Sequence, residues 1–305
     1  MRAYEFENFS KAIEQASYYL QYRSNVVHSA RWQGADIANR PEMATHEVTH
    51  VSFCVNMGAM NVPATPGISV GGDIGVLAED IKPNLPWADN HFEERVSGAP
   101  MNPGTEWANW PYGKSAAGFL KDGKFNHNYM ERYWPKFAGM IEAPTTDKAD
   151  WEEKFDLLGW EAMPTTEPRV QPNFGIMYQY GDLNDVIRLL CEDPYTRQAY
   201  LPVWFPEDTG GGAKRAPCTI GYHFLMRDGR LDVNYHIRSC DFVRHFRDDL
   251  YLTARLLLWV LYKLREIDDR WNDVLPGKFM MQIGSLHIFR NDYLMLFGPK
   301  VAKDR

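Results

Sequence analysis

Cys218 is the residue of this sequence whose neighbours best suit covalent chemistry. It lies in the segment APCT, directly after the basic pair at 214–215, and Arg238 is expected to lie close to it in the fold. Positive charge near a cysteine favours the thiolate, the form of sulfur that attacks carbon. An inert, packed thiol is the alternative interpretation. Cys240 is the competing candidate, although its position at the start of an expected helix indicates a structural role.

A β-hairpin is expected to place Arg238 beside Cys218. The segments 217–227 and 231–238 flank an Asp-Gly pair at 228–229, which is typical of tight hairpin turns. In the second segment apolar and polar residues alternate, so one strand face is apolar and the other is polar. We expect the polar face to line a cavity, and it carries Asp232, Asn234, His236 and Arg238.

Other periodic segments must support this hairpin. Apolar residues at helical spacing predict an amphipathic helix within the first 22 residues, and the β-branched run 45–56 predicts a strand. Residues 242–264 predict a long, buried helix, and 279–289 a last strand.

Two stretches lack such periodicity. Gly and Pro are frequent at about 57–105, which predicts long ordered loops of the kind that shape binding sites, and a second irregular stretch lies near 143–172. Neither has the low complexity of a linker, and there is no internal repeat. We therefore expect one domain, residues 1–305.

Composition narrows the possible functions. With 305 residues, 45% of them hydrophobic, the chain can bury a large core, and a net charge of −7 argues against a general nucleic-acid binder. The four cysteines show no metal-type spacing, so we expect no metal and reduced thiols in the cytoplasm. The start lacks the apolar core of a signal peptide, and the apolar run 250–264 is interrupted by Arg255 and Lys263, so we expect no membrane partner.

Five short segments in order give a specific resemblance. The chain resembles the thymidylate synthase family in the segments APC, RDGRL, YHIRSCD, FRDDLY and IGSLHIF. Within that family it resembles most the deoxycytidylate hydroxymethylases of phages, which share the sequence forms found here at 246–249 and 284–287. Upstream, NRPEMATHEV resembles the phosphate loop, with Arg40 as a phosphate ligand, and DPYTRQ resembles the segment whose arginine, here Arg197, reaches the partner's phosphate. TEWANW and NFG resemble the segments of the catalytic glutamate, here Glu106, and the pocket wall.

The resemblance implies a role for each site residue. Cys218 is the expected nucleophile, Glu106 handles protons with ordered water, and Asp249 recognises the base. The substrate-binding residues that it implies are Arg40, Arg197, Arg215, Arg238, Ser239, Asp241, Asp249, His287 and Phe289. The folate-binding residues that it implies are Trp107, His245 and Asp248.

The expected chemistry begins with the thiolate of Cys218 adding to ring carbon 6 of a pyrimidine, which makes ring carbon 5 nucleophilic. Carbon 5 then captures the one-carbon unit of methylenetetrahydrofolate. Asp249 stands where the synthases have an asparagine, and a carboxylate only accepts hydrogen bonds, which suits the amino group of cytosine. The alternative is that Asp248 and Asp249 cap or solvate a helix start.

Departures from the family pattern affect the folate and sugar sites. His245 replaces a glycine, Asp248 replaces an aromatic residue of the synthases, and Phe289 replaces a tyrosine that binds the sugar hydroxyl. The last change makes room for a ribose oxygen, so CMP and dCMP are both candidate substrates. Only 16 residues follow Phe289, which favours a wet pocket and hence addition of water.

We therefore expect a CMP or dCMP 5-hydroxymethyltransferase that uses methylenetetrahydrofolate. One alternative is a synthase-type methylase acting on dUMP or dCMP, and another is a catalytically inactive nucleotide-binding homologue. The resemblance implies an α+β fold with a large mixed β-sheet covered by helices. It also implies a homodimer packed sheet to sheet.

Overall fold

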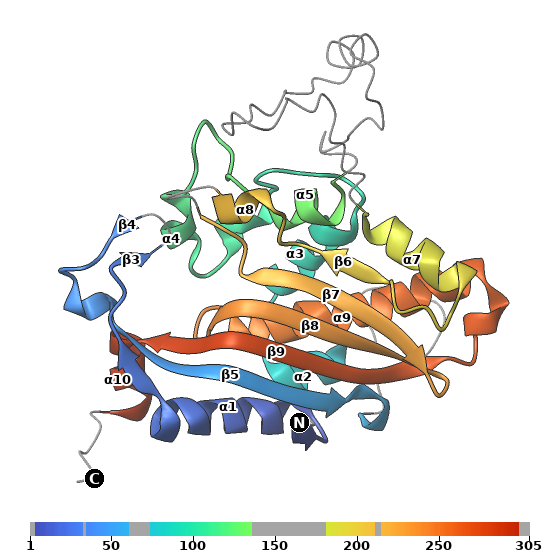
Figure 1. Ribbon diagram of the computed structural model, residues 1–305, viewed down its shortest axis with the longest axis horizontal. Coiled ribbons are helices and arrows are strands. Elements are labelled where there is room, and N and C mark those ends of the chain that lie inside the picture. Colours follow the sequence, from blue (N-terminus) through green and yellow to red (C-terminus); the bar gives the residue numbers. More distant parts are fainter. Residues whose placement is uncertain (1–3, 33–34, 61–73, 136–180, 211–214, 299–305) are drawn as a thin grey trace, which may run out of the picture.

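The computed structural model describes residues 4–32, 35–60, 74–135, 181–210 and 215–298. Its centre is a seven-stranded sheet in the order β1-β5-β9-β8-β7-β6, with β2 paired to β5 (Figure 1). The strands are β1 (Tyr4–Phe6), β2 (Asn25–Val27), β5 (Thr45–Asn56), β6 (Tyr200–Pro202), β7 (Thr219–Arg227), β8 (Arg230–Asp241) and β9 (Leu275–Phe289), and β3 (Arg31–Trp32) and β4 (Ala35–Asp36) form a separate pair. The β1–β5 and β8–β9 pairs are parallel and the other pairs antiparallel, so the expected mixed sheet is confirmed.

The hairpin of β7 and β8 forms as the sequence predicts. Arg227 pairs with Arg230, and Asp228 (φ 51°) and Gly229 (φ 68°) take the left-handed conformation that a tight two-residue turn needs. The odd-numbered residues of β8 are buried up to Ile237.

The polar face of β8 does not line the site as a whole. Of its four residues only Arg238 borders one of the two cavities described below. The other face of the strand also borders the larger cavity. There Ser239 and Asp241 follow the buried apolar residues of β8 and present polar side chains to the cavity.

The described helices are α1 (Phe9–Arg23), α2 (Gly75–Ile81), α3 (Trp87–Val96), α4 (Gly113–Ala117), α5 (Tyr129–Tyr133), α7 (Leu183–Glu192), α8 (Glu207–Gly210), α9 (Phe246–Ile267) and α10 (Arg290–Phe297). Short 3-10 helices are η1 (Pro41–Met43), η2 (Met57–Ala59), η3 (Glu106–Asn109) and η4 (Asp269–Trp271). In Figure 1, α9 and α2 lie behind the sheet, and in the described part of the chain no helix covers the face of β7, β8 and β9 turned to the viewer.

The long helix begins four residues later than predicted. Asp241 accepts hydrogen bonds from the backbone N–H of Val243 and of Arg244, which folds residues 242–245 into a turn before α9. The prediction of loops at 57–105 is wrong for α2 and α3, whose segments contain at most one glycine and no proline. The irregular stretch near 143–172 lies outside the described residues.

The predicted fold class is thus confirmed as α+β with a large mixed sheet, while the single domain and the dimer stay predictions. Within the described ranges no helix is both long and apolar enough to cross a membrane.

Candidate active site

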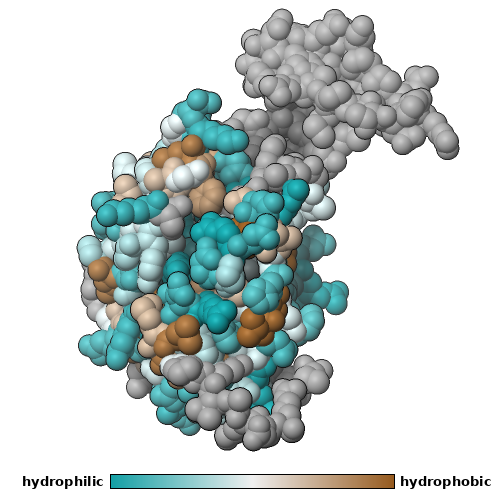
Figure 2. Space-filling view, turned by 90° about the vertical axis from the view of Figure 1, so that its left-hand side faces the viewer, coloured by the Kyte–Doolittle hydropathy of each residue, from teal (hydrophilic) through white to brown (hydrophobic). Residues whose placement is uncertain are grey.

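Two cavities meet at Cys218. The larger, of about 950 Å³, lies at the end of the sheet beneath β3 and α4, and the smaller, of about 140 Å³, extends toward α3 and α9. Figure 2 shows this end of the molecule, where hydrophobic patches interrupt a hydrophilic surface. Both cavities are lined by Trp110, Ala116, Arg215, Ala216, Cys218, Ser239 and His245.

Cys218 is held at the start of the hairpin. Its carbonyl accepts the backbone N–H of Arg238 at 2.9 Å, and its side chain is partly exposed to the cavities. Burial raises the pKa of the thiol, and the positive charges of Arg238 and Arg215 lower it by less. The arginines therefore gather as expected, but the ligand-free protein holds a thiol rather than a thiolate. Lys214, also expected nearby, lies outside the described residues.

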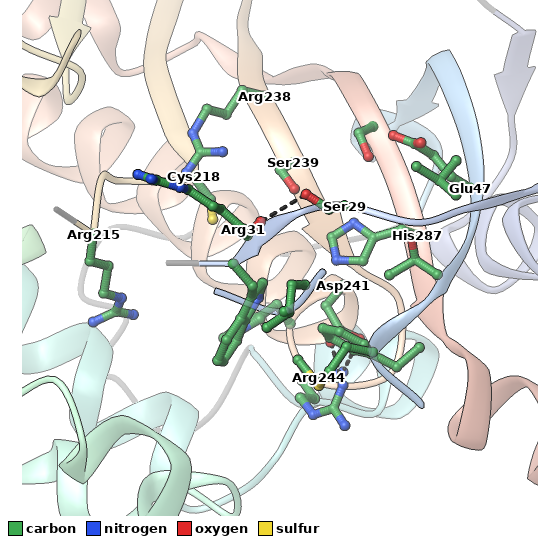
Figure 3. Close-up of a pocket in the computed structure, with 18 of the residues that line it drawn as sticks. Ser29, Arg31, Glu47, Arg215, Cys218, Arg238, Ser239, Asp241, Arg244 and His287 are labelled. Atoms are coloured by element: carbon green, nitrogen blue, oxygen red, sulfur yellow. Dashed lines mark hydrogen bonds and ion pairs between the residues drawn. The ribbon is translucent and has the colours of Figure 1, made fainter. Parts of the chain in front are cut away.

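Three of the four predicted phosphate-binding arginines border the larger cavity, namely Arg40, Arg215 and Arg238, and Figure 3 labels the last two. Arg238 donates to the carbonyls of residues 216 and 217 at 3.0 and 2.9 Å, and Arg215 packs its guanidinium 5.2 Å from the ring centre of Phe119. Arg40 pairs with Glu42 at 2.8 Å. Arg197 is exposed and borders neither cavity, so its own chain's site does not use it.

Two further arginines that border the larger cavity were not predicted from the sequence. Arg31 reaches it from β3, and Arg244 from the turn before α9 (Figure 3). Arg244 is neutralised by Asp241 at 2.6 Å and Asp292 at 2.8 Å, whereas Arg31 makes no ion pair with any described residue. No family-like segment surrounds Arg31, so only its place in the fold reveals it.

The other predicted sugar and base contacts also border the larger cavity. Ser239, His287 and Phe289 line it, with the rings of His287 and Phe289 edge to face at 5.9 Å. Burial lowers the pKa of His287, so its ring is neutral at neutral pH. Asp241 lines the same cavity, but Arg244 and the turn before α9 occupy its oxygens, which indicates that it organises the site.

The smaller cavity contains Asp249, in the first turn of α9. Cys240 donates its S–H to Asp249 Oδ2 at 3.6 Å, consistent with the structural role expected for this cysteine. Burial raises the pKa of Asp249 to about 7, against the opposing charge of Arg95. Both protonation states of this carboxyl group are therefore populated at neutral pH.

Asp248 and Asp249 differ in their surroundings. Asp248 borders the smaller cavity, but its two oxygens accept the backbone and side-chain N–H groups of Asn84, each at 2.8 Å. It thus fastens α9 to the loop before α3 and is poorly placed to bind folate directly. Asp249, in contrast, is partly exposed to the smaller cavity and makes no capping hydrogen bond with a described backbone group.

The structure does not bring Glu106 into the site. It begins η3, its carboxylate lies near the side-chain amides of Asn90 (3.4 Å) and Asn109 (3.2 Å), and it borders neither cavity. Its own backbone N–H donates to Glu94, which fixes this orientation. The prediction of Glu106 as the proton-handling carboxylate therefore lacks geometric support.

Aromatic rings form much of the wall of the smaller cavity, which suits a flat ring system. His245 stacks on Trp110 at 4.7 Å, Trp107 meets Phe125 edge to face at 5.5 Å, and Tyr129 adds a further ring. Burial lowers the pKa of His245 to about 4, so it is neutral. Trp107 and His245 both border this cavity, and their role in folate binding stays a prediction, whereas the NFG segment at 173–175 lies outside the described residues.

Comparison with known proteins agrees with the motifs. Residues 158–297 match the family model described as thymidylate synthase. Over 138 residues the chain is 29% identical to the deoxyuridylate hydroxymethyltransferase of Bacillus phage SP01. That match covers 45% of this chain and 33% of the relative, so the chain spans about a third of the length of this curated relative. Both matches confirm the predicted resemblance to the thymidylate synthase family and its hydroxymethylases, although this relative is named for deoxyuridylate and not for deoxycytidylate.

Proposed function

We propose that this chain, which resembles the thymidylate synthase family and its hydroxymethylases, is a folate-dependent transferase that adds a hydroxymethyl group to ring carbon 5 of a pyrimidine nucleoside monophosphate. The observation that carries the proposal is the position of Cys218 where an arginine-lined cavity meets an aromatic one that contains Asp249. A nucleotide whose phosphate lies in the first cavity and whose base lies in the second would place its ring at the sulfur.

The arginines hold the phosphate in this proposal. A guanidinium presents a planar fork of donors that matches phosphate oxygens, and Arg215, Arg238 and Arg40 border the same cavity. Arg31 adds a cation that no described carboxylate neutralises. A nucleoside without phosphate should therefore bind weakly.

Cys218 activates the base. Its sulfur bonds to ring carbon 6, and the electron pair of the bond between carbons 5 and 6 makes carbon 5 nucleophilic. Methylenetetrahydrofolate, when bound against the aromatic wall, would supply the one-carbon unit and leave as tetrahydrofolate, after which water would add to complete the hydroxymethyl group and the sulfur of Cys218 would leave carbon 6.

In place of Glu106, His127 would orient the water that takes the proton from carbon 5, because burial lowers the pKa of this histidine to about 3 and its neutral ring holds a proton only weakly. This histidine borders the smaller cavity, and its Nδ1–H donates to the carbonyl of Arg215 at 3.2 Å, which leaves a lone pair on Nε2.

Asp249 supports cytidylate as the substrate. An ionised carboxylate accepts from the amino group of cytosine, whereas facing the carbonyl of uracil it would leave two acceptors together, at a cost of about 1–3 kcal/mol. Uridylate is the second candidate, since the phage relative is named for deoxyuridylate and since Asp249, when protonated, offers a donor as an asparagine does. We expect His287 and Phe289, which border the larger cavity, to contact the sugar and so to distinguish ribose from deoxyribose.

A homodimer completes the proposal. Arg197 is exposed and borders neither of the two cavities described above, and one face of β7, β8 and β9 carries no described helix (Figure 1). Packing of two such faces would let Arg197 serve the partner's phosphate. Activity should then fall on dilution to monomers.

Incubation with methylenetetrahydrofolate and each of CMP, dCMP, UMP and dUMP tests the proposal, with the products identified by mass spectrometry. We expect CMP or dCMP to gain one hydroxymethyl group. A methyl product formed together with dihydrofolate would instead establish the methylase alternative. Nucleotide binding with no release of tritium from labelled carbon 5 would establish the inactive homologue.

A further inference from the structure

Arg95 is a buried cation without a counterion. It lies on α3, is 5% exposed, and lines the smaller cavity together with Cys218 and Asp249. Its guanidinium carbon lies 4.2 Å from the ring centre of Tyr129, and no described carboxylate lies within ion-pair distance. A buried charge without a partner is costly, so a ligand that supplies one is expected.

The other two fully buried arginines of the described chain are paired. Arg132 contacts Asp208 at 2.9 Å, and Arg255 contacts Asp89 at 2.6 Å and Glu93 at 2.9 Å. Arg95 differs from both because its surroundings are rings, a histidine and the open cavity.

A chain of hydrogen bonds on α3 fixes the orientation of Arg95. Its Nε donates to His91 Nε2 at 3.0 Å, and His91 Nδ1 faces the carboxylate of Glu94 at 3.4 Å. Burial lowers the pKa of His91 to about 4, so the ring is neutral and can accept. Glu94 is held in turn by Thr105, through its N–H at 2.6 Å and its hydroxyl at 2.7 Å.

The anchored Nε leaves the fork of Arg95 free. Neither terminal nitrogen has a hydrogen-bond partner among the described residues, and the side chain borders the cavity. Asp249 borders the same cavity beyond ion-pair distance, and each side chain affects the pKa of the other. A ligand edge placed between them would meet two donors from one side and an acceptor from the other.

We propose that Arg95 determines base specificity by donating to ring nitrogen 3 and the carbonyl oxygen at position 2 of cytosine, while Asp249 accepts from the neighbouring amino group. This inference rests on the proposed function and deepens it. A guanidinium fork matches two adjacent acceptors, and cytosine presents that pair beside its amino donor. Uracil carries an N–H at ring position 3, which would oppose the donors of Arg95.

The same contact assists the first chemical step. When the thiolate of Cys218 bonds to carbon 6, the pair of the bond between carbons 5 and 6 moves between carbons 4 and 5. The pair between carbon 4 and nitrogen 3 then moves onto nitrogen 3, and the negative charge spreads to the oxygen at position 2. Arg95 donates to both atoms that receive this charge, so its interaction strengthens as the adduct forms.

Deletion of one ligand atom tests the contact. In a Cys218→Ser background, calorimetry compares CMP with 3-deaza-CMP, which carries carbon and hydrogen in place of ring nitrogen 3. With Arg95 present we expect CMP to bind about 10-fold or more tighter, since the analogue leaves a charged donor unpaired. With Arg95→Met the two should bind about equally. An unchanged CMP preference in Arg95→Met would overturn the proposal.

Two further variants separate this contact from folding and geometry. Arg255→Met removes another buried arginine outside both cavities, and it should lower thermal stability while keeping the CMP preference. Arg95→Lys keeps the charge but loses the fork, and should keep only part of the preference. A loss of preference in Arg255→Met equal to that in Arg95→Met would show a structural effect and contradict the assignment.

The binding ratio does not depend on turnover, so the two proposals fail separately. If the wild-type chain forms no hydroxymethyl product but the CMP preference still depends on Arg95, only the proposed function fails. If product forms while Arg95→Met leaves the preference unchanged, only the Arg95 inference fails. Tighter binding of UMP than of CMP would also overturn the assignment to cytosine.

Discussion

The choice of base should change with pH, because one carboxyl group in the smaller cavity changes its hydrogen-bonding character near neutrality. Burial raises the pKa of Asp249 to about 7. Above this pH the group is an acceptor that suits the amino group of cytosine, and below it the acid offers a donor to the carbonyl of uracil. The groups that act on it are Arg95 from α3, Asp248 from α9, and Tyr235 and Cys240 from β8.

The size of the change follows from this pKa. The ratio of ionised to protonated Asp249 is about 0.1 at pH 6 and about 10 at pH 8. If cytidylate needs the ionised form and uridylate the protonated one, the ratio of their kcat/KM values rises about 100-fold over this range. Ionisation of Cys218 affects both nucleotides alike, so it cancels in the ratio.

The assay measures kcat/KM for both nucleotides at a series of pH values, in wild type and in Asp249→Asn. The asparagine does not titrate, so its ratio should be flat with pH and, at pH 8, shifted toward uridylate relative to wild type. A wild-type ratio that does not change between pH 6 and pH 8 would refute the assignment of base recognition to Asp249.

Two other variants test the energetics of the site. Asp249 has an ordinary pKa of 3.8, and its higher value in the folded state means that ionisation opposes folding. The cost is absent at low pH, grows as pH rises above the ordinary value and is complete above about 7, where it reaches about 4 kcal/mol at most. Asp249→Asn should therefore raise the melting temperature at pH 8 more than at pH 5, measured by calorimetry, and an equal shift at both would contradict this cause. Arg238→Ala should weaken CMP binding about 10-fold or more but leave cytidine binding nearly unchanged, measured by titration calorimetry. An equal loss for both ligands would show that Arg238 does not bind the phosphate.

Local patterns predicted the elements that carry Cys218. The Asp-Gly turn and the alternation after it define β7 and β8, and the β-branched run 45–56 coincides with β5. These features depend on residues close together in the chain, so short-range stereochemistry is sufficient.

The smaller cavity was harder to predict, because its residues meet only through the tertiary structure. Arg95 and Asp249 are far apart in sequence, and nothing near Arg95 signals a base-binding role. The helix that carries it was hidden by the glycines and prolines on either side. The position of Glu106 outside both cavities was hidden for the same reason, since its carboxylate lies near Asn90 and its backbone N–H donates to Glu94, and both of these residues belong to α3.

Trapping of the covalent adduct tests the role of Cys218 most directly. A cytidylate with fluorine at ring carbon 5 has no proton there to lose, so an adduct formed with methylenetetrahydrofolate should persist through proteolysis and mass spectrometry. We predict that the nucleotide will be attached to the peptide that contains Cys218, and that Cys218→Ser will abolish the attachment. Attachment to Cys240, or no adduct with 5-fluorinated cytidylate or uridylate despite tight binding, would contradict the account.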